Sequence, residues 1–197
     1  MRFIATCKIG LESVVSLELR RLGIEVEKVE DARVLFLGDY QTMAKACLWL
    51  RTAERVLMEV ASFEARSFEE LFQGTRAITW EDYLPRDAAF PVKGYSISSQ
   101  LHAVPACQSI IKKAMVERMK AHYGLEQFPE DGVKHQVRFS LFKDEAMICL
   151  DTSGEGLYKR GYRAVGVEAP LRETLAGVDY RYDPVYHQFI PITSKEV

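Results

Sequence analysis

The stretch RFIATCKIGLESVVSLELRRLGIEVEKVEDARVLFLG, residues 2–38, sets the order of the first elements of this chain. Its opening run, RFIATC, is short and β-prone, and the run after Gly10 places apolar residues at the spacing of one helical face. Gly23 is well placed to end that helix, because glycine adopts the left-handed conformation of a helix terminus without strain. VEKVE and RVLFLG are then typical of two strands joined through Asp31 and Ala32.

The next residues complete a unit of six elements. YQTMAKACLWL, residues 40–50, predicts a second amphipathic helix, and RVLMEVASF, residues 55–63, predicts a final strand. The order β-α-β-β-α-β is that of a ferredoxin-like domain. We therefore expect an α+β fold that begins with a ferredoxin-like domain over residues 1–66. No pattern in this unit resembles a site.

A second module is expected from residue 67 onward. Ser67 and Glu70 match the S-x-x-E capping box and predict a helix start. FPVKGYSIS predicts a strand, and Pro105 suits the first turn of the long helix that follows it. VKHQVRFSLF and EAMICLD alternate in polarity and predict a hairpin joined at Lys143 and Asp144.

The distribution of charge is more informative than its total. The formal net charge is −2, but residues 91–163 carry 11 Lys and Arg against 8 Asp and Glu. No GxGxxG, GxxxxGK[ST], HExxH or GxSxG motif occurs. The four cysteines lie far apart without histidine partners, which favours free thiols in a reducing compartment and no metal. With neither a signal peptide nor a long apolar run, we expect a cytoplasmic protein with no membrane contact.

The segment DTSGEGLYKRGYR, residues 151–163, has the composition of a polyanion-binding loop. Its glycines allow close approach of the backbone to a ligand or a positive φ, and its cations suit phosphates. Its tyrosines could stack on unpaired bases. An alternative is a loop whose tyrosines pack on the domain and whose cations are solvated. The candidate residues here are Tyr158, Lys159, Arg160, Tyr162 and Arg163.

A second group of candidates lies in and before the long helix. Lys112, Lys113 and Lys120 fall within an arc of about 100° on one helical face. They form either a cationic strip or an ordinary solvated face, since Glu117 can pair with Lys113. The polar residues before the helix, Ser99 and His102 with Ser98, are either further RNA contacts or capping and turn groups.

Several motifs resemble one known family. SSQLHAVPACQSIIKKAM (98–115), LDTSGEGLYKRGYR (150–163) and EAPLRETLAG (168–177) look like the front half of bacterial THUMP-containing methyltransferases that form N2-methylguanosine in large-subunit ribosomal RNA. IGLESVVSLELRRLG and LWLRTAERVLM agree with the same family's ferredoxin-like domain.

The resemblance implies a ferredoxin-like domain, a THUMP domain over residues 67–164, and over 165–197 the start of a methyltransferase domain with a divergent tail. It implies RNA as the partner, ribosomal RNA in preference to transfer RNA, with S-adenosylmethionine as the cofactor of the catalytic domain.

The last residues depart from the family. GVDYRYDPVYHQFIPITSKEV contains Asp183 and Pro184 but no glycine-rich turn after them, and the chain has no Pro-Pro pair. Roughly twenty residues cannot build a cofactor-binding sheet. We therefore expect a chain that holds no cofactor and is not itself a catalyst, but serves a separate or fused methyltransferase domain. A stand-alone RNA-binding or protein-interaction protein is the alternative.

Overall fold

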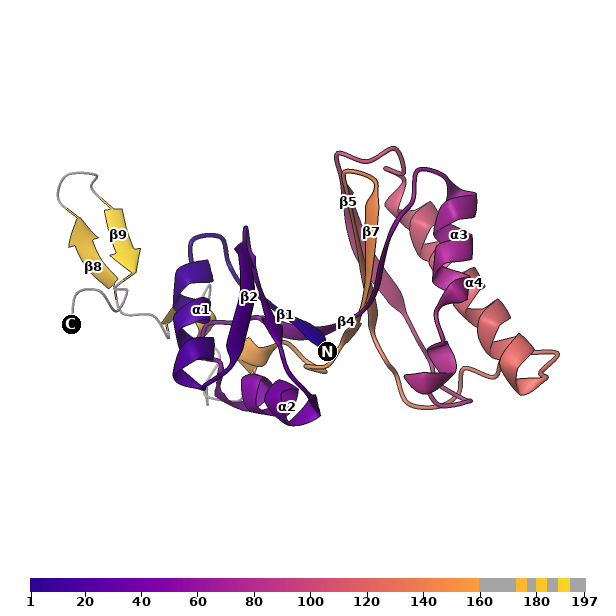
Figure 1. Ribbon diagram of the computed structural model, residues 1–197, viewed down its shortest axis with the longest axis horizontal. Helices are drawn as coiled ribbons and strands as arrows, with labels where there is room; N and C mark the ends of the chain where they lie inside the picture. The colour runs from indigo at the N-terminus through magenta and orange to yellow at the C-terminus, as the bar shows by residue number, and fades with distance from the viewer. Residues whose placement is uncertain (160–172, 177–179, 184–187, 192–197) are drawn as a thin grey trace, which may run out of the picture. The chain divides into compact units, whose positions relative to one another are not determined.

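The computed structural model describes residues 1–159, 173–176, 180–183 and 188–191 (Figure 1). Its contacts divide the chain into two compact units. Unit 1 holds Met1–Met58 together with the described residues from Thr152 onward, and unit 2 holds Glu59–Asp151. Each unit is an α+β structure, which confirms the predicted fold class.

Unit 1 has the predicted order of six elements. These are β1 (Arg2–Thr6), α1 (Glu12–Arg21), β2 (Glu25–Glu30), β3 (Arg33–Leu37), α2 (Tyr40–Trp49) and β4, whose full span is Arg55–Glu64. The strand order in the sheet is β2-β3-β1-β4, with β1 antiparallel to both of its neighbours. This arrangement places the first and last strands of the unit side by side, as the βαββαβ topology requires.

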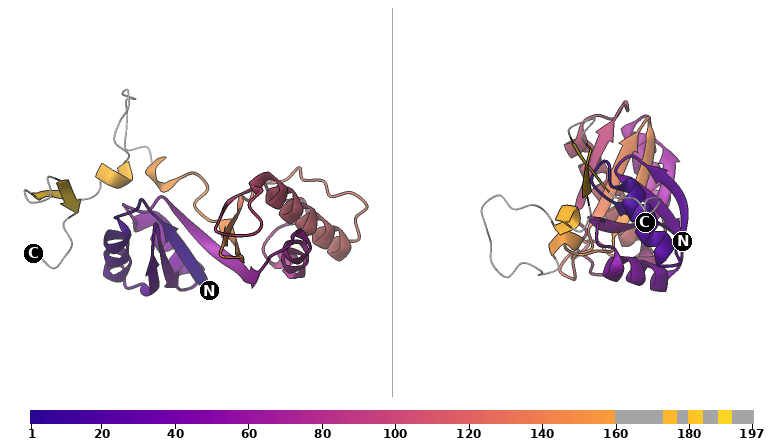
Figure 2. Two further views of the ribbon diagram at one scale, coloured as in Figure 1. Left: turned by 90° about the horizontal axis from the view of Figure 1, so that it is seen from above. Right: turned by 90° about the vertical axis from the view of Figure 1, so that its left-hand side faces the viewer.

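Figure 2 shows the ribbon of unit 1 from two further directions. Apolar residues from both helices and the central strands form the core of this unit. Phe3 and Phe36 stack with their ring centroids 5.5 Å apart. Val15 and Leu19 of α1 and Leu50 after α2 are fully buried. The predicted face of the first helix is therefore the one that packs against the sheet.

Unit 2 contains the remaining part of β4, then α3 (Phe68–Ala77), the short 3₁₀ helix η1 (Trp80–Asp82), β5 (Val92–Ile97), α4 (Val104–Tyr123), β6 (Val137–Phe142) and β7 (Glu145–Asp151). Its strand order is β4-β7-β6-β5. β6 and β7 form the predicted antiparallel hairpin, whereas β5 pairs with β6 in parallel. A crossover connection is needed between parallel neighbours, and α4 provides it.

Both helices of unit 2 lie on one face of its sheet (Figure 1). α4 buries Ile111, Met115 and Met119 there. The predicted capping box of Ser67 and Glu70 is present at the start of α3, and Pro105 lies in the first turn of α4. The opposite face of the sheet has no helix from this unit, and Tyr95, Ile97 and Phe142 are exposed on it.

The four cysteines are free thiols, as expected; three are buried and Cys47 is half-buried. Burial raises the pKa of Cys7 to about 12.

Among the residues described, no helix is long and apolar enough to cross a membrane, and no cluster of His, Cys, Asp and Glu is suited to a metal ion. The short elements described after β7 are η2 (Leu157–Lys159), α5 (Glu173–Ala176) and the antiparallel pair β8 (Tyr180–Asp183) and β9 (Gln188–Pro191).

Candidate nucleic-acid interface

The end of unit 2 where α4 begins is held together by the turn between β6 and β7. Lys143 and Asp144 both have positive φ, 52° and 65°, as a two-residue hairpin turn of this hand requires. The Asp144 carboxylate accepts a hydrogen bond from the Gln100 N–H at 2.7 Å. The Asp144 N–H donates to the Ser99 hydroxyl at 3.0 Å. The turn therefore fixes the loop that leads into α4.

Ser99 is a structural hydrogen-bonding group at this end. Its hydroxyl also donates to the Ile97 carbonyl at 3.1 Å, so both capacities of the oxygen are used within the protein. Its backbone neighbour Ser98 has a φ of 51°, which marks a tight reversal directly after β5. This geometry favours the turn-forming interpretation of Ser99 over direct contact with a ligand.

His102 is exposed at the same end. Its Nδ1 lies 3.0 Å from the Gln100 carbonyl oxygen, which can only accept, so Nδ1 carries the proton of this bond. Nε2 is left to accept from, or when protonated donate to, an external group. The helix that starts two residues later has no side-chain cap and no acidic residue in its first turn. The dipole of α4 and the first-turn N–H groups, other than at Pro105, which has none, favour an anion there.

The lysines of α4 differ from one another in their surroundings. Lys112 is ion-paired to Glu130 at 2.8 Å and lies over the Phe90 ring, 5.6 Å from its centroid. Lys113 is two-thirds exposed, with Glu117 at 3.9 Å. Lys120 is half-buried near the end of the helix. Lys113 is thus the most available cation of the predicted strip, and Lys112 is largely committed to its own domain.

The segment after β7 packs on unit 1. Thr152 donates from its hydroxyl to the Val56 carbonyl at 2.7 Å, and the Val56 N–H donates to the Ser153 hydroxyl at 2.6 Å. The Leu157 N–H donates to the Glu54 carbonyl at 2.9 Å. Hydrogen bonds therefore hold the first half of DTSGEGLYKRGYR against the start of β4.

The structure explains why two positions of that segment are occupied by glycine. Gly154 has a φ of +66°, a conformation that favours glycine. A Cβ at Gly156 would collide with the ring of Tyr158, which packs against it. Tyr158 is half-buried, and Lys159 is half-exposed with Glu155 at 3.3 Å. Arg160, Tyr162 and Arg163 lie outside the described residues.

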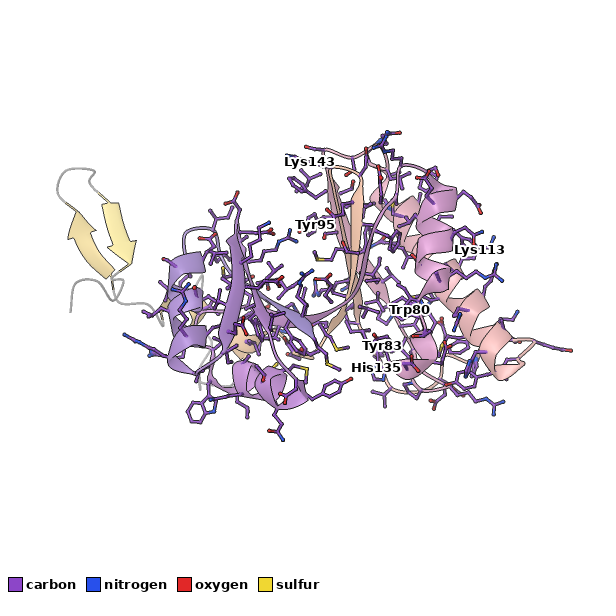
Figure 3. All side chains as sticks on the ribbon, viewed as in Figure 1. Trp80, Tyr83, Tyr95, Lys113, His135 and Lys143 are labelled. Atoms are coloured by element: carbon purple, nitrogen blue, oxygen red, sulfur yellow. The ribbon has the colours of Figure 1, made fainter. Side chains whose placement is uncertain are left out.

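The predicted candidates thus fall into three groups. Ser99 bonds to the β6–β7 turn and His102 to Gln100 of the same loop, the three lysines lie along α4, and Tyr158 and Lys159 belong to unit 1. Figure 3 shows Lys113 on the helix layer, whereas Tyr95 and Lys143 lie on the strand side of unit 2.

Sequence reasoning did not select the exposed face of this sheet. Tyr95 is 49% exposed, Ile97 52% and Phe142 45%. The alternation of VKGYSI and VRFSLF, which predicted the strands, also indicates which residues share this face. The sequence of these strands contains no charge cluster or motif, so nothing further in it indicated that this face could be a binding site.

Comparison with protein families accounts for both units. The model described as the RlmL ferredoxin-like domain matches residues 2–57, and the THUMP domain model matches residues 65–151. The chain is an RlmL-type ferredoxin-like domain followed by a THUMP domain. Unit 1 thus contains the ferredoxin-like domain and unit 2 the THUMP domain. The segment from Thr152 onward follows the matched part of the THUMP domain and contacts the ferredoxin-like one.

Longer proteins share both domains. The "Putative RNA methyltransferase YpsC" of Bacillus subtilis is 49% identical over 175 residues, which are 88% of this chain and 45% of the relative. The "Ribosomal RNA large subunit methyltransferase K/L" of Syntrophotalea carbinolica is 35% identical over 180 residues, 89% of this chain and 25% of the relative. The chain therefore spans less than half the length of these curated relatives.

Solved structures give the same relationship. A crystal structure titled as a predicted N6-adenine-specific DNA methylase from Listeria monocytogenes is 47% identical, with a TM-score of 0.84, and aligns with 89% of this chain and 46% of its own. SMU.472, titled a putative methyltransferase complexed with SAH, is 45% identical, with a TM-score of 0.83 and the same coverage. The names of these relatives agree on methyl transfer and differ on the nucleic acid.

Proposed function

We propose that this chain is the RNA-capture module of an S-adenosylmethionine-dependent RNA methyltransferase that modifies the N2 position of a guanosine in 23S ribosomal RNA. The THUMP match and the names of the RNA-methyltransferase relatives support RNA as the ligand. The preference for ribosomal RNA rests on the name of the K/L relatives and on the motifs of this chain. Catalysis is assigned to a domain joined to or associated with this one.

The observation that carries the proposal is the uncapped start of α4 in the THUMP domain, which follows a loop held by the turn that contains Lys143. Asp144 and Ser99 hydrogen-bond within this loop and turn, and His102 lies in the same loop, two residues before α4. The Asp144 carboxylate accepts from the Gln100 N–H, and Lys143 forms no ion pair in the described part of the chain. This end is suited to RNA phosphates.

The residues that the structure describes do not fit the cofactor. Nucleotide-like cofactors of Rossmann-type domains need a glycine-rich turn between a parallel strand and a helix N-terminus. The one described crossover from a strand into a helix with a parallel partner, β5 into α4, passes through SSQLHAVP, which has no glycine. We therefore assign S-adenosylmethionine to the catalytic domain and RNA binding to this chain.

The test is a fluorescence-anisotropy titration with a labelled hairpin of 23S ribosomal RNA and with a transfer RNA, each at about 50 mM and about 200 mM salt. The proposal predicts binding that weakens steeply with salt, and tighter binding of the ribosomal hairpin. Tighter binding of transfer RNA would change the proposed substrate from ribosomal RNA to transfer RNA, while the proposed role in RNA capture would stand. Absence of binding to both at low salt would overturn the proposal in favour of a protein partner.

A further inference from the structure

The sheet of the THUMP domain presents one face without a helix, and side chains on that face are regularly placed. β5 directs Lys93, Tyr95 and Ile97 to it, because the alternate residues of this strand face the helices. β6 directs Arg138, Ser140 and Phe142 to it by the same alternation. The parallel register pairs Lys93 with Arg138, Tyr95 with Ser140 and Ile97 with Phe142.

Two aromatic side chains on this face are diagonal neighbours across the adjacent strands β5 and β6. Tyr95 and Phe142 occupy neighbouring strands, two positions apart in register. Strand geometry places their Cα atoms about 8 Å apart. Both rings are about half exposed, at 49% and 45%, so each has an accessible surface. The nearby Ile97, 52% exposed, extends the apolar surface between them.

The charges on this face favour an anionic partner. Arg138 is neutralised by Asp151, whose carboxylate lies 2.8 Å away and is fully buried. Glu145 lies opposite Phe142 and accepts from the Ser62 hydroxyl at 2.9 Å. Lys93 and Lys143 form no ion pair in the described part of the chain, and the Lys143 ammonium lies 5.3 Å from the Phe142 centroid.

We propose that this face binds unpaired nucleotides of the RNA, with bases stacked on Tyr95 and Phe142 and phosphates held by Lys93 and Lys143. Aromatic side chains on an open sheet are a general platform for unpaired bases, because every base has a π-face. A protein partner would be expected to cover Ile97 without requiring the two unpaired lysines. The inference rests on the proposed function, since it names which part of an RNA this domain contacts.

The test uses the full chain and a labelled single-stranded RNA of about ten nucleotides, with a blunt RNA duplex of the same sequence as the second probe. Tyr95→Ala with Phe142→Ala is expected to weaken binding of the single strand at least about tenfold. Binding of the duplex should change less than about twofold. Tyr95→Phe should retain the affinity, because stacking needs the ring and not the hydroxyl.

A matched control is available in the same chain. Tyr40 and Phe68 are exposed to 55% and 39% and are the first residues of α2 and α3, so neither belongs to the strands that form this face. Their double alanine variant should bind the single strand like the native chain. Glu145→Gln should bind it more tightly, since it removes the carboxylate beside Phe142. Circular dichroism must show that each variant is folded.

The outcomes separate this inference from the proposed function. Unchanged single-strand binding in the folded Tyr95 and Phe142 variant, or binding of the duplex alone by the native chain, would overturn the inference and leave RNA capture standing. Failure of the native chain to bind any RNA at low salt would overturn both. Selective loss of single-strand binding would support both.

Discussion

The Val56 N–H donates a hydrogen bond to the Ser153 hydroxyl at 2.6 Å, and the same hydroxyl lies 3.2 Å from the Val56 carbonyl. This double contact joins the segment after the THUMP domain to the last strand of the ferredoxin-like domain. The chain thus leaves the first domain in β4, forms the THUMP domain, and returns to the same strand. The position of Lys159 is set by this return.

Ser153→Ala should lower the free energy of unfolding of the ferredoxin-like domain by about 1–3 kcal/mol, because it leaves the N–H of the fully buried Val56 without its acceptor. Urea unfolding followed by circular dichroism measures it. Ser109→Ala is the control, since that exposed hydroxyl only bonds to the carbonyl of its own helix. Equal effects of the two substitutions would contradict this interpretation of Ser153.

Gly94→Ala should destabilise the THUMP domain by about 1–3 kcal/mol. A Cβ at Gly94 would overlap the carbonyl oxygen and ring of Phe139 on the adjacent strand. The fluorescence of the fully buried Trp80 reports unfolding of this domain, in a Trp49→Phe background. Ser140→Ala, on the open face of the same sheet, should change stability little. A stable Gly94→Ala variant would show that the strands can separate at this point without cost.

The THUMP domain should lose stability in acid partly through Glu81. Hydrogen bonding by Arg118 holds the pKa of the Glu81 carboxyl below its ordinary value of 4.5, and His122 Nδ1 lies 3.3 Å from the same carboxylate. The folded state therefore binds this proton less readily than the unfolded state, so the stabilisation is present above pH 4.5 and is lost as the pH falls through the lowered pKa.

Glu81→Gln provides the measurement. Its stability deficit relative to the native chain should be largest near pH 7 and should shrink as the pH falls below 4.5 and through the lowered pKa of Glu81. Urea midpoints of the two proteins over this pH range give the comparison. A deficit that stays constant across this range would show that Glu81 acts through packing and not through its charge.

Reversal of charge after the THUMP domain should weaken RNA binding. Lys159→Glu with Arg160→Glu is expected to lower the affinity at low salt and to reduce the steepness of its salt dependence. Thermal stability should be nearly unchanged, because exposed ion pairs such as that of Lys159 with Glu155 contribute little. Arg20→Glu with Arg21→Glu, an equal charge change at the end of α1, is the control. Equal losses in both would indicate general electrostatic attraction in place of a defined contact.

Local sequence signals predicted the elements well. The βαββαβ order, the capping box at Ser67 and the hairpin turn at Lys143 and Asp144 are all confirmed. These features depend on periodicity, caps and turns, which neighbouring residues determine. The pairing of β5 with β6 in parallel depends on distant contacts and could not be read from local patterns.

The candidate site was less accessible to sequence reasoning. Composition identified Lys112 as a cation but could not show its ion pair with Glu130. The glycines of the segment after β7 suggested ligand contact, whereas Gly156 accommodates the ring of Tyr158. Tyr95 and Phe142 belong to separate strands, and only the register between these strands places them on a common surface.

The most direct test of RNA capture is photocrosslinking of the chain to 23S ribosomal RNA hairpins that carry 4-thiouridine, followed by mass spectrometry of the crosslinked peptides. The account predicts crosslinks in the THUMP domain, at the peptides that contain Tyr95, His102 and Phe142, and in the segment that contains Tyr158. Crosslinks confined to α1 and α2 of the ferredoxin-like domain, or none above the level of a non-binding control protein, would contradict it.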